Sequence, residues 1–240
     1  MRGAATSLPP SRMTGQLPLP FPHQPSYSPA DFLGAASNEA ALDWLERTGE
    51  WPDGRLALWG EAGCGKTHLL RIWAGLRGAV LLNGPDLRGL PDLPPPPGAA
   101  LDNGDALADE AALLHLLNAA REAGVPVLLA ARTPPARWQV RLPDLASRLR
   151  AITAVEIAPA EDSLLRALLL RLLSDRQLGV GPAIQDWLLL RLPRSAAALR
   201  EAAARLDRAA MASGGKVTRA IAAAVLAEMG AGGEPPAEPP

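Results

Sequence analysis

The sequence has a single cysteine and only three histidines in 240 residues. One thiol, that of Cys64, cannot form an internal disulfide. The three histidines, His23, His68 and His115, lie far apart and do not have the spacing of a zinc site. These shortages exclude a disulfide-stabilised secreted domain and a zinc protein.

Long apolar runs are also missing. No stretch approaches the roughly 18–20 apolar residues of a membrane span, and prolines occupy the N-terminal positions where a signal peptide has its apolar segment. We therefore expect a soluble, cytoplasmic protein with no membrane partner. The formal net charge of −1 provides no global field that would attract nucleic acid, although only two of the 24 basic residues are lysine.

Proline, by contrast, is abundant and unevenly placed. Of the 25 prolines, seven lie in residues 1–29, five in residues 91–97 and four in residues 231–240. Because 48% of the chain is hydrophobic, the remainder has enough apolar surface for a buried core. We expect a flexible, proline-rich tail over residues 1–30, a folded body from 31 to 229 and a disordered tail over 230–240.

Five short apolar runs have the length of buried strands and alternate with stretches of helical spacing. We expect these strands at residues 55–59, 79–82, 99–101, 125–130 and 152–157. The helices are expected from an N-cap at Ser37 to Gly49, and over residues 66–76, 106–123 and 136–147. This alternation predicts an α/β subdomain over residues 31–159, with a five-stranded parallel sheet covered by helices.

After Pro159 every periodic stretch is helical. We expect helices over residues 161–176, 182–192, 195–212 and 218–229, separated by glycine and proline. Residues 160–229 therefore predict a small, all-helical lid subdomain behind the α/β subdomain.

A phosphate-binding motif connects the first predicted strand to the next helix. The chain matches G-x-x-x-x-G-K-[ST] at Gly60, Glu61, Ala62, Gly63, Cys64, Gly65, Lys66 and Thr67, and His68 follows. Glycines allow successive backbone N–H groups to point at phosphate oxygens, and the helix N-terminus adds a favourable dipole. Lys66 is expected to reach the β- and γ-phosphates and Thr67 to ligate Mg²⁺, so ATP or ADP with Mg²⁺ is the predicted cofactor.

A metal-positioning carboxylate is expected on a neighbouring strand, and Asp102 ends the predicted third strand. The alternative is an ordinary strand-end turn, because Asp-Asn-Gly is favourable turn chemistry. The next residue, Asn103, lies where many ATPases have a second acid that polarises the attacking water. An amide cannot accept a proton as a carboxylate can, which predicts slow intrinsic hydrolysis.

In combination these motifs resemble a known family. Gly-Lys-Thr-His-Leu-Leu at residues 65–70, preceded by Asp31-Phe-Leu-Gly34 and Ser37-Asn38, is similar to the AAA+ module of the bacterial replication initiator DnaA. More specifically, the chain resembles the Hda family of DnaA-related regulators, which lack the DNA-binding domain of the initiator. Asp102-Asn103 and the segment Asp144-Leu-Ala-Ser-Arg-Leu149 carry this closer likeness. The resemblance implies an AAA+ P-loop NTPase fold over residues 26–229.

The resemblance also implies roles for single residues. Arg148 would be an arginine finger presented to the γ-phosphate of a neighbouring subunit, and Arg194 a lid arginine that reaches back to the nucleotide. Phe32 and Leu33 would line the base pocket. Read without the resemblance, the two arginines are solvated surface residues and the two apolar residues are ordinary core. Neither residue after the fourth strand, at 132–133, is the usual polar sensor of the family, so that role is unassigned.

The N-terminal tail contains a second resemblance. Residues 16–21 are similar to the short motif with which replication proteins bind the β sliding clamp, and the residues concerned are Gln16, Leu17, Leu19, Pro20 and Phe21. A proline-stiffened segment loses little entropy on binding. The alternative is a proline-rich tail without a partner.

Together these features predict a clamp-tethered regulator that stimulates hydrolysis of ATP bound to DnaA and is itself at most a weak or slow ATPase. Expected partners are DnaA and the sliding clamp, the resemblance allows a homodimer, and no direct, specific DNA binding is expected. One alternative is a truncated DnaA-like initiator or loader ATPase that acts on DNA as an oligomer. The near-neutral charge and the missing DNA-binding module count against it. Another is a small-molecule P-loop kinase, which would need an acceptor pocket and further phosphate-binding residues in the lid.

Overall fold

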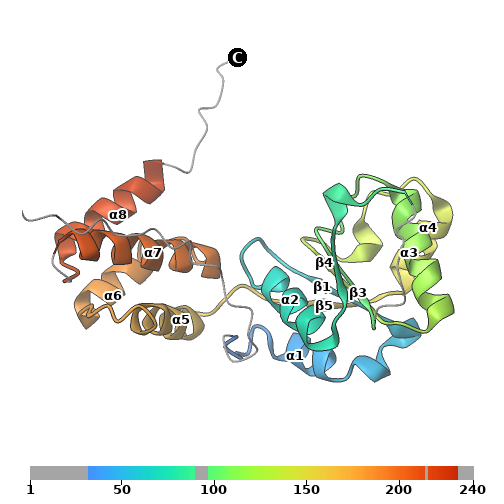
Figure 1. Ribbon diagram of the computed structural model, residues 1–240, viewed down its shortest axis with the longest axis horizontal. Helices are drawn as coiled ribbons and strands as arrows, with labels where there is room; N and C mark the ends of the chain where they lie inside the picture. The colour runs from blue at the N-terminus through green and yellow to red at the C-terminus, as the bar shows by residue number, and fades with distance from the viewer. Residues whose placement is uncertain (1–31, 90–96, 214–215, 232–240) are drawn as a thin grey trace, which may run out of the picture.

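A computed structural model describes residues 32–89, 97–213 and 216–231. The clamp-like motif lies outside these ranges, as do most of the proline-rich stretch at 91–97 and the chain after residue 231. The described residues form an α/β subdomain followed by a group of helices (Figure 1).

The α/β subdomain contains the expected five-stranded parallel sheet. Its strands are β1 (Arg55–Trp59), β2 (Val80–Asn83), β3 (Ala99–Asp102), β4 (Val127–Ala131) and β5 (Thr153–Glu156), arranged in the order β2-β3-β4-β1-β5. All five residues of β4 are buried, as strands covered on both faces require. All strands run in one direction, so their carboxyl ends meet at one edge of the sheet, which carries the P-loop and Asp102.

Helices cover both faces of this sheet, because successive strand side chains point to opposite sides. On one face α1 (Glu39–Glu46) and α2 (Lys66–Arg77) share a core with Leu56 and Leu58. On the other face α3 (Glu110–Ala123) and α4 (Pro143–Ala151) share a core with Ala57. Short 3₁₀ turns occupy Thr48–Glu50, Pro52–Gly54, Gly84–Asp86 and Pro135–Arg137, and are labelled η2 to η5.

Several helix boundaries differ from the sequence expectation, and local chemistry accounts for the two largest differences. The expected helix at 136–147 begins only at Pro143, where a proline suits the first helical position, and ends at Ala151. The expected helix at 106–123 begins at Glu110, because the Asp109 side chain accepts a 3.1 Å hydrogen bond from the backbone N–H of Ala112 and caps the helix. Hydrogen bonds from backbone N–H groups also hold the pKa of Asp109 below its usual value. The first helix begins after Asn38 rather than after Ser37.

The four expected lid helices are present as α5 (Asp162–Ser174), α6 (Pro182–Leu189), α7 (Ala196–Ala212) and α8 (Arg219–Ala231). They enclose a separate apolar core with fully buried leucines at Leu169, Leu188, Leu199 and Leu206. Figure 1 shows this lid beside the α/β subdomain, with one end of α7 turned toward α2. None of the helices described here combines the length and the apolar character that crossing a membrane requires.

Candidate phosphate and metal site

The P-loop folds around the ammonium group of its own lysine. Lys66 Nζ donates hydrogen bonds of 2.7 Å to the carbonyl oxygens of both Gly60 and Glu61, and lies 3.6 Å from Cys64 Sγ. Gly65, with φ of 109°, precedes α2 and turns the chain into the helix. The loop thus places a cation and the N-terminus of a twelve-residue helix at the carboxyl edge of the sheet.

Thr67 and Asp102 meet at this edge, as the sequence predicts. Thr67 Oγ1 donates a 2.8 Å hydrogen bond to Asp102 Oδ2, although β1 and β3 are separated in the sheet by β4. A hydroxyl beside a carboxylate is an oxygen donor pair of the kind that Mg²⁺ prefers. These two side chains therefore fit the magnesium role expected of them.

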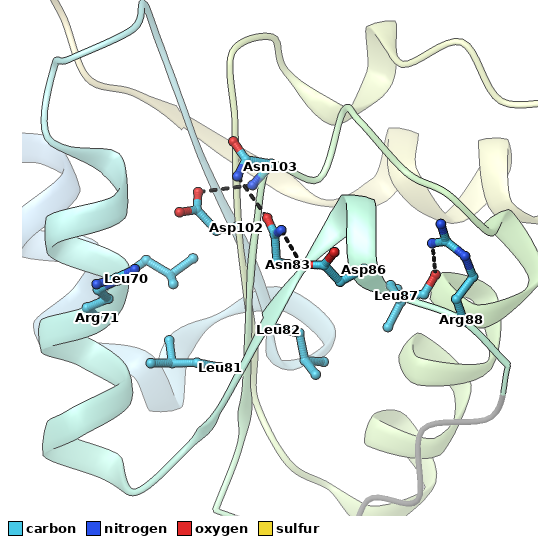
Figure 2. Close-up of a pocket in the computed structure, with 10 residues that line it drawn as sticks. All are labelled: Leu70, Arg71, Leu81, Leu82, Asn83, Asp86, Leu87, Arg88, Asp102 and Asn103. Atoms are coloured by element: carbon cyan, nitrogen blue, oxygen red, sulfur yellow. Dashed lines mark hydrogen bonds between the residues drawn. The ribbon is translucent and has the colours of Figure 1, made fainter.

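Asn103 points along the sheet edge toward β2. Its backbone is left-handed, with φ of 52°, and its Nδ2 donates a 2.9 Å hydrogen bond to Asn83 Oδ1. Asn83 Nδ2 in turn donates to Asp86 Oδ2 at 2.6 Å. Figure 2 shows this chain of three side chains running from the tip of β3 across β2 to η4. The Asn103 amide is therefore held by a neighbouring strand.

A cleft of about 650 Å³ opens next to this polar chain. It is lined on one side by Arg71 from α2 and on the other by Arg88, which follows η4, with the half-exposed side chain of Leu81 between them (Figure 2). Arg88 Nη1 donates to the carbonyl oxygens of Pro85 and Leu87 at 2.7 and 2.9 Å. The cleft shares Asp102 and Asn103 with the phosphate site.

The lid approaches the P-loop through the beginning of α7. A side chain on Gly63, whose φ is 83°, would place its Cβ 2.6 Å from the Cβ of Ser195, the N-cap of α7. One turn further along, Arg200 Nη2 lies 3.3 Å from Nδ1 of His68 on α2. This seam brings lid residues beside the phosphate loop.

Arg194 directly precedes the N-cap of α7, and its recorded contacts lie within the lid, so its expected role at the nucleotide stays a prediction. Its guanidinium pairs with Asp162 of α5, with 2.5 Å between Nη1 and Oδ1, and donates to the carbonyl oxygen of Ala160 at 3.4 Å. The lid arginine that contacts the P-loop helix is Arg200, to which sequence reasoning gave no role. A contact between residues 132 positions apart leaves no local signal in the sequence.

Phe32 and Leu33 lie at the same seam. The Phe32 ring is 5.5 Å from the ring of His68, centroid to centroid, and lies beside Gly65. Leu33 packs against the apolar core of the lid, whereas Phe32 packs against the core of the α/β subdomain. The two residues therefore border the region between the P-loop and the lid, where the sequence expectation placed a base pocket.

Arg148 lies away from this edge. It belongs to α4, which ends at Ala151 just before β5 begins, and β5 starts opposite Leu56 of β1. Electrostatic repulsion from Arg148 contributes to lowering the pKa of Arg55, the buried first residue of β1, after the larger effect of burial. Arg148 itself forms an ion pair with Asp144 at 3.2 Å. Its charge is therefore near the edge where strands begin, whereas the P-loop follows the end of β1.

The remaining expectations concern residues 132–133 and metal clusters. The backbone N–H of Arg132 donates to Asp105 Oδ2 at 2.9 Å, and the Thr133 carbonyl oxygen accepts from Trp138 Nε1 at 2.9 Å, so neither contact identifies a sensor. Across residues 32–89, 97–213 and 216–231, no group of three or more His, Cys, Asp or Glu side chains could hold a metal ion.

No protein-family model matches the chain, and no curated protein matches it significantly. Among solved structures, domain III of the replication initiation protein DnaA of Thermotoga maritima matches with a TM-score of 0.70 at 16% identity, over 87% of this chain and 98% of that chain. An arginine-to-alanine variant of RuvB from Thermotoga maritima matches with a TM-score of 0.65 at 19% identity, over 85% and 72%. DnaA from Aquifex aeolicus, bound to AMPPCP, matches with a TM-score of 0.57 at 16% identity, over 70% and 61%.

At these identities the similarity concerns the fold. The chain has the AAA+ P-loop NTPase fold, with its five-stranded parallel sheet followed by a helical lid. It spans 61% of the length of the Aquifex initiator chain that it matches.

Proposed function

We propose that the chain is an AAA+ nucleotide-binding regulator of replication initiation, related to Hda, that stimulates hydrolysis of ATP bound to DnaA. Lys66 and the P-loop N–H groups would hold the phosphates of ATP or ADP. Thr67 and Asp102 would hold Mg²⁺, which neutralises phosphate charge when it is bound. The 2.8 Å contact between these two side chains supports this assignment.

The observation that carries the regulatory part of the proposal is the position of Arg148. β1 is five residues long, so the edge where strands begin and the edge with the P-loop are about 16 Å apart. Arg148, near the first of these edges, is too far from the chain's own P-loop to serve it. An arginine in this place suits a finger offered to the γ-phosphate of another subunit, where a guanidinium neutralises developing charge.

We place the productive chemistry in a mixed assembly of this chain with DnaA. The supports are the fold that it shares with DnaA domain III and the Asp144-Leu-Ala-Ser-Arg-Leu149 segment that holds Arg148. The tail motif at residues 16–21 would tether the regulator to the sliding clamp on DNA. Asn103, an amide held by Asn83, makes the chain itself a weak or slow ATPase at most.

The decisive experiment measures hydrolysis of labelled ATP bound to DnaA, with and without this protein and with and without DNA-loaded clamp. We expect hydrolysis to accelerate only when protein and loaded clamp are both present, and Arg148→Ala to remove the acceleration. Arg150→Ala, two residues along the same helix, is the matched control and should retain it. No acceleration by the wild-type protein with both components present would refute the proposed function.

A further inference from the structure

The lid carries an aromatic ring with two arginines on it. Trp187 belongs to α6, and the guanidinium carbons of Arg191 and Arg219 lie 4.7 and 5.5 Å from the centroid of its ring. Arg191 follows α6, and Arg219 is the first residue of α8. The ring therefore contacts one cation from the turn after its own helix and one from α8, at separations where cation–π attraction holds a guanidinium in place.

Neither of these arginines forms an ion pair within the part of the chain that the structure describes, whereas most other lid arginines do. The hydrogen bond recorded for Arg191 is a 3.3 Å contact to the carbonyl oxygen of Trp187, and both side chains are exposed. Without a carboxylate partner, the exposed guanidinium groups keep N–H donors for another ligand, and the fork geometry of a guanidinium suits an oxyanion.

Arg219 lies far along the lid from the phosphate loop, whereas Arg191 precedes by four residues Ser195, which lies beside Gly63. α7 starts beside Gly63 and continues for 17 residues, which places its far end about 25 Å away. α8 starts shortly after that far end, and Figure 1 shows its beginning at the side of the lid turned away from the α/β subdomain. The contacts recorded for the two arginines within the described residues are to Trp187, and none is to the phosphate loop.

The charge of the lid adds to this local effect. Residues 160–231 contain ten basic and seven acidic residues, whereas residues 32–159 contain twelve basic and fifteen acidic ones. Although the formal net charge of the whole chain is only −1, residues 160–231 are therefore net positive and residues 32–159 net negative. The lid is the half of the molecule that attracts a polyanion.

We propose that Arg191 and Arg219, held on Trp187, bind backbone phosphates of nucleic acid without reading base sequence. The ring that could stack on a base is occupied by the two guanidinium groups, so contact falls on phosphates. An acidic peptide is the other polyanion to consider. Leu190, beside Arg191, is 81% exposed and projects from the surface, so it does not line a recess for an apolar peptide side chain.

The test uses the full chain and a short fluorescent oligothymidylate, with polyglutamate as competitor and binding followed by anisotropy over a series of salt concentrations. For Arg191→Gln combined with Arg219→Gln we expect binding about tenfold weaker, and a log–log salt slope smaller by about one to two. Arg208→Gln removes one other exposed lid arginine and is the control, with its effect compared per charge removed. Circular dichroism and thermal unfolding verify that each variant is folded.

Each outcome decides the proposal. Loss in the double variant with binding retained in Arg208→Gln supports it. Weakening by Arg208→Gln that equals the loss in the double variant per charge removed would indicate a diffuse charge effect and overturn the assignment. If polyglutamate competes as well as unlabelled oligothymidylate does, the ligand of this site is an acidic peptide, and the proposal of nucleic-acid phosphates is overturned. The inference does not depend on the proposed action on DnaA.

Discussion

Thr67 Oγ1 and Asp102 Oδ2 are joined by a 2.8 Å hydrogen bond across 35 positions of sequence. The bond brings the start of α2 to the tip of β3 and prepares two oxygen ligands at one point. If Mg²⁺ strengthens nucleotide binding, the size of that gain should therefore depend on the negative charge of Asp102.

Asp102→Asn keeps the size of the side chain and removes its charge. We expect Mg²⁺ to strengthen binding of a fluorescent ADP to the wild-type protein, and this gain to fall about tenfold in the variant, as for the loss of one strong charged contact. Titrations with and without Mg²⁺ measure it. Asp105→Asn, which alters a nearby acid bound to the backbone of Arg132, should keep the gain. A full Mg²⁺ response in Asp102→Asn would contradict the metal assignment.

Asn103→Glu supplies the proton acceptor that the native amide lacks. Single-turnover hydrolysis should be faster in this variant than in the wild type, because a carboxylate can polarise water and take its proton. Asn83→Ala frees the same position from its 2.9 Å hydrogen bond without adding a base, and should not accelerate the reaction. Equal rates for wild type and Asn103→Glu would show that the amide does not limit hydrolysis.

Gly63→Ala tests the seam between P-loop and lid. Its φ of 83° disfavours a side chain by roughly 1 kcal/mol or more, and the added Cβ would lie 2.6 Å from the Ser195 Cβ. We expect weaker nucleotide binding and a lower melting temperature. Gly75→Ala is the control, because nothing lies within 4 Å of the new Cβ. Gly75 belongs to α2, and alanine has a higher helix propensity than glycine, so stability should be unchanged or slightly higher. Wild-type affinity in Gly63→Ala would mean that the lid is not held against the loop.

The tail motif is tested by replacing Gln16, Leu19 and Phe21 with alanine. Co-elution with the sliding clamp in gel filtration should be lost, because these side chains would fill the pockets that give a short peptide its affinity. If these residues belong to a tail outside the folded body, as the sequence predicts, the melting temperature should not change. If the triple variant still co-elutes, the tail is not the tether.

Much of the fold could be predicted because its signals are local. The short runs of Leu, Ala and Val gave all five strands, and a strand end followed by a carboxylate placed Asp102 beside Thr67. The helix expected at 136–147 begins later, because Pro143 suits the first position of α4.

The parts that sequence could not give depend on tertiary contact. The Asp-Asn-Gly turn was apparent, but not that its amide would bind Asn83 of the edge strand. The sequence pointed to Arg194 as the lid arginine, and only the packing of α7 near α2 brings Arg200 to His68. Of the two cations on Trp187, Arg191 is only four residues away in the chain, whereas Arg219 comes from α8, beyond α7.

Phe32 and Leu33 are adjacent in the chain but belong to different apolar cores. One peptide bond therefore links the angle of the lid to the residues that flank the P-loop. A ligand that favours one lid angle must change, by the same factor, the affinity of any partner that prefers that angle, because binding free energies form a closed cycle. A partner that bends the lid would thus also change how tightly the protein binds its nucleotide.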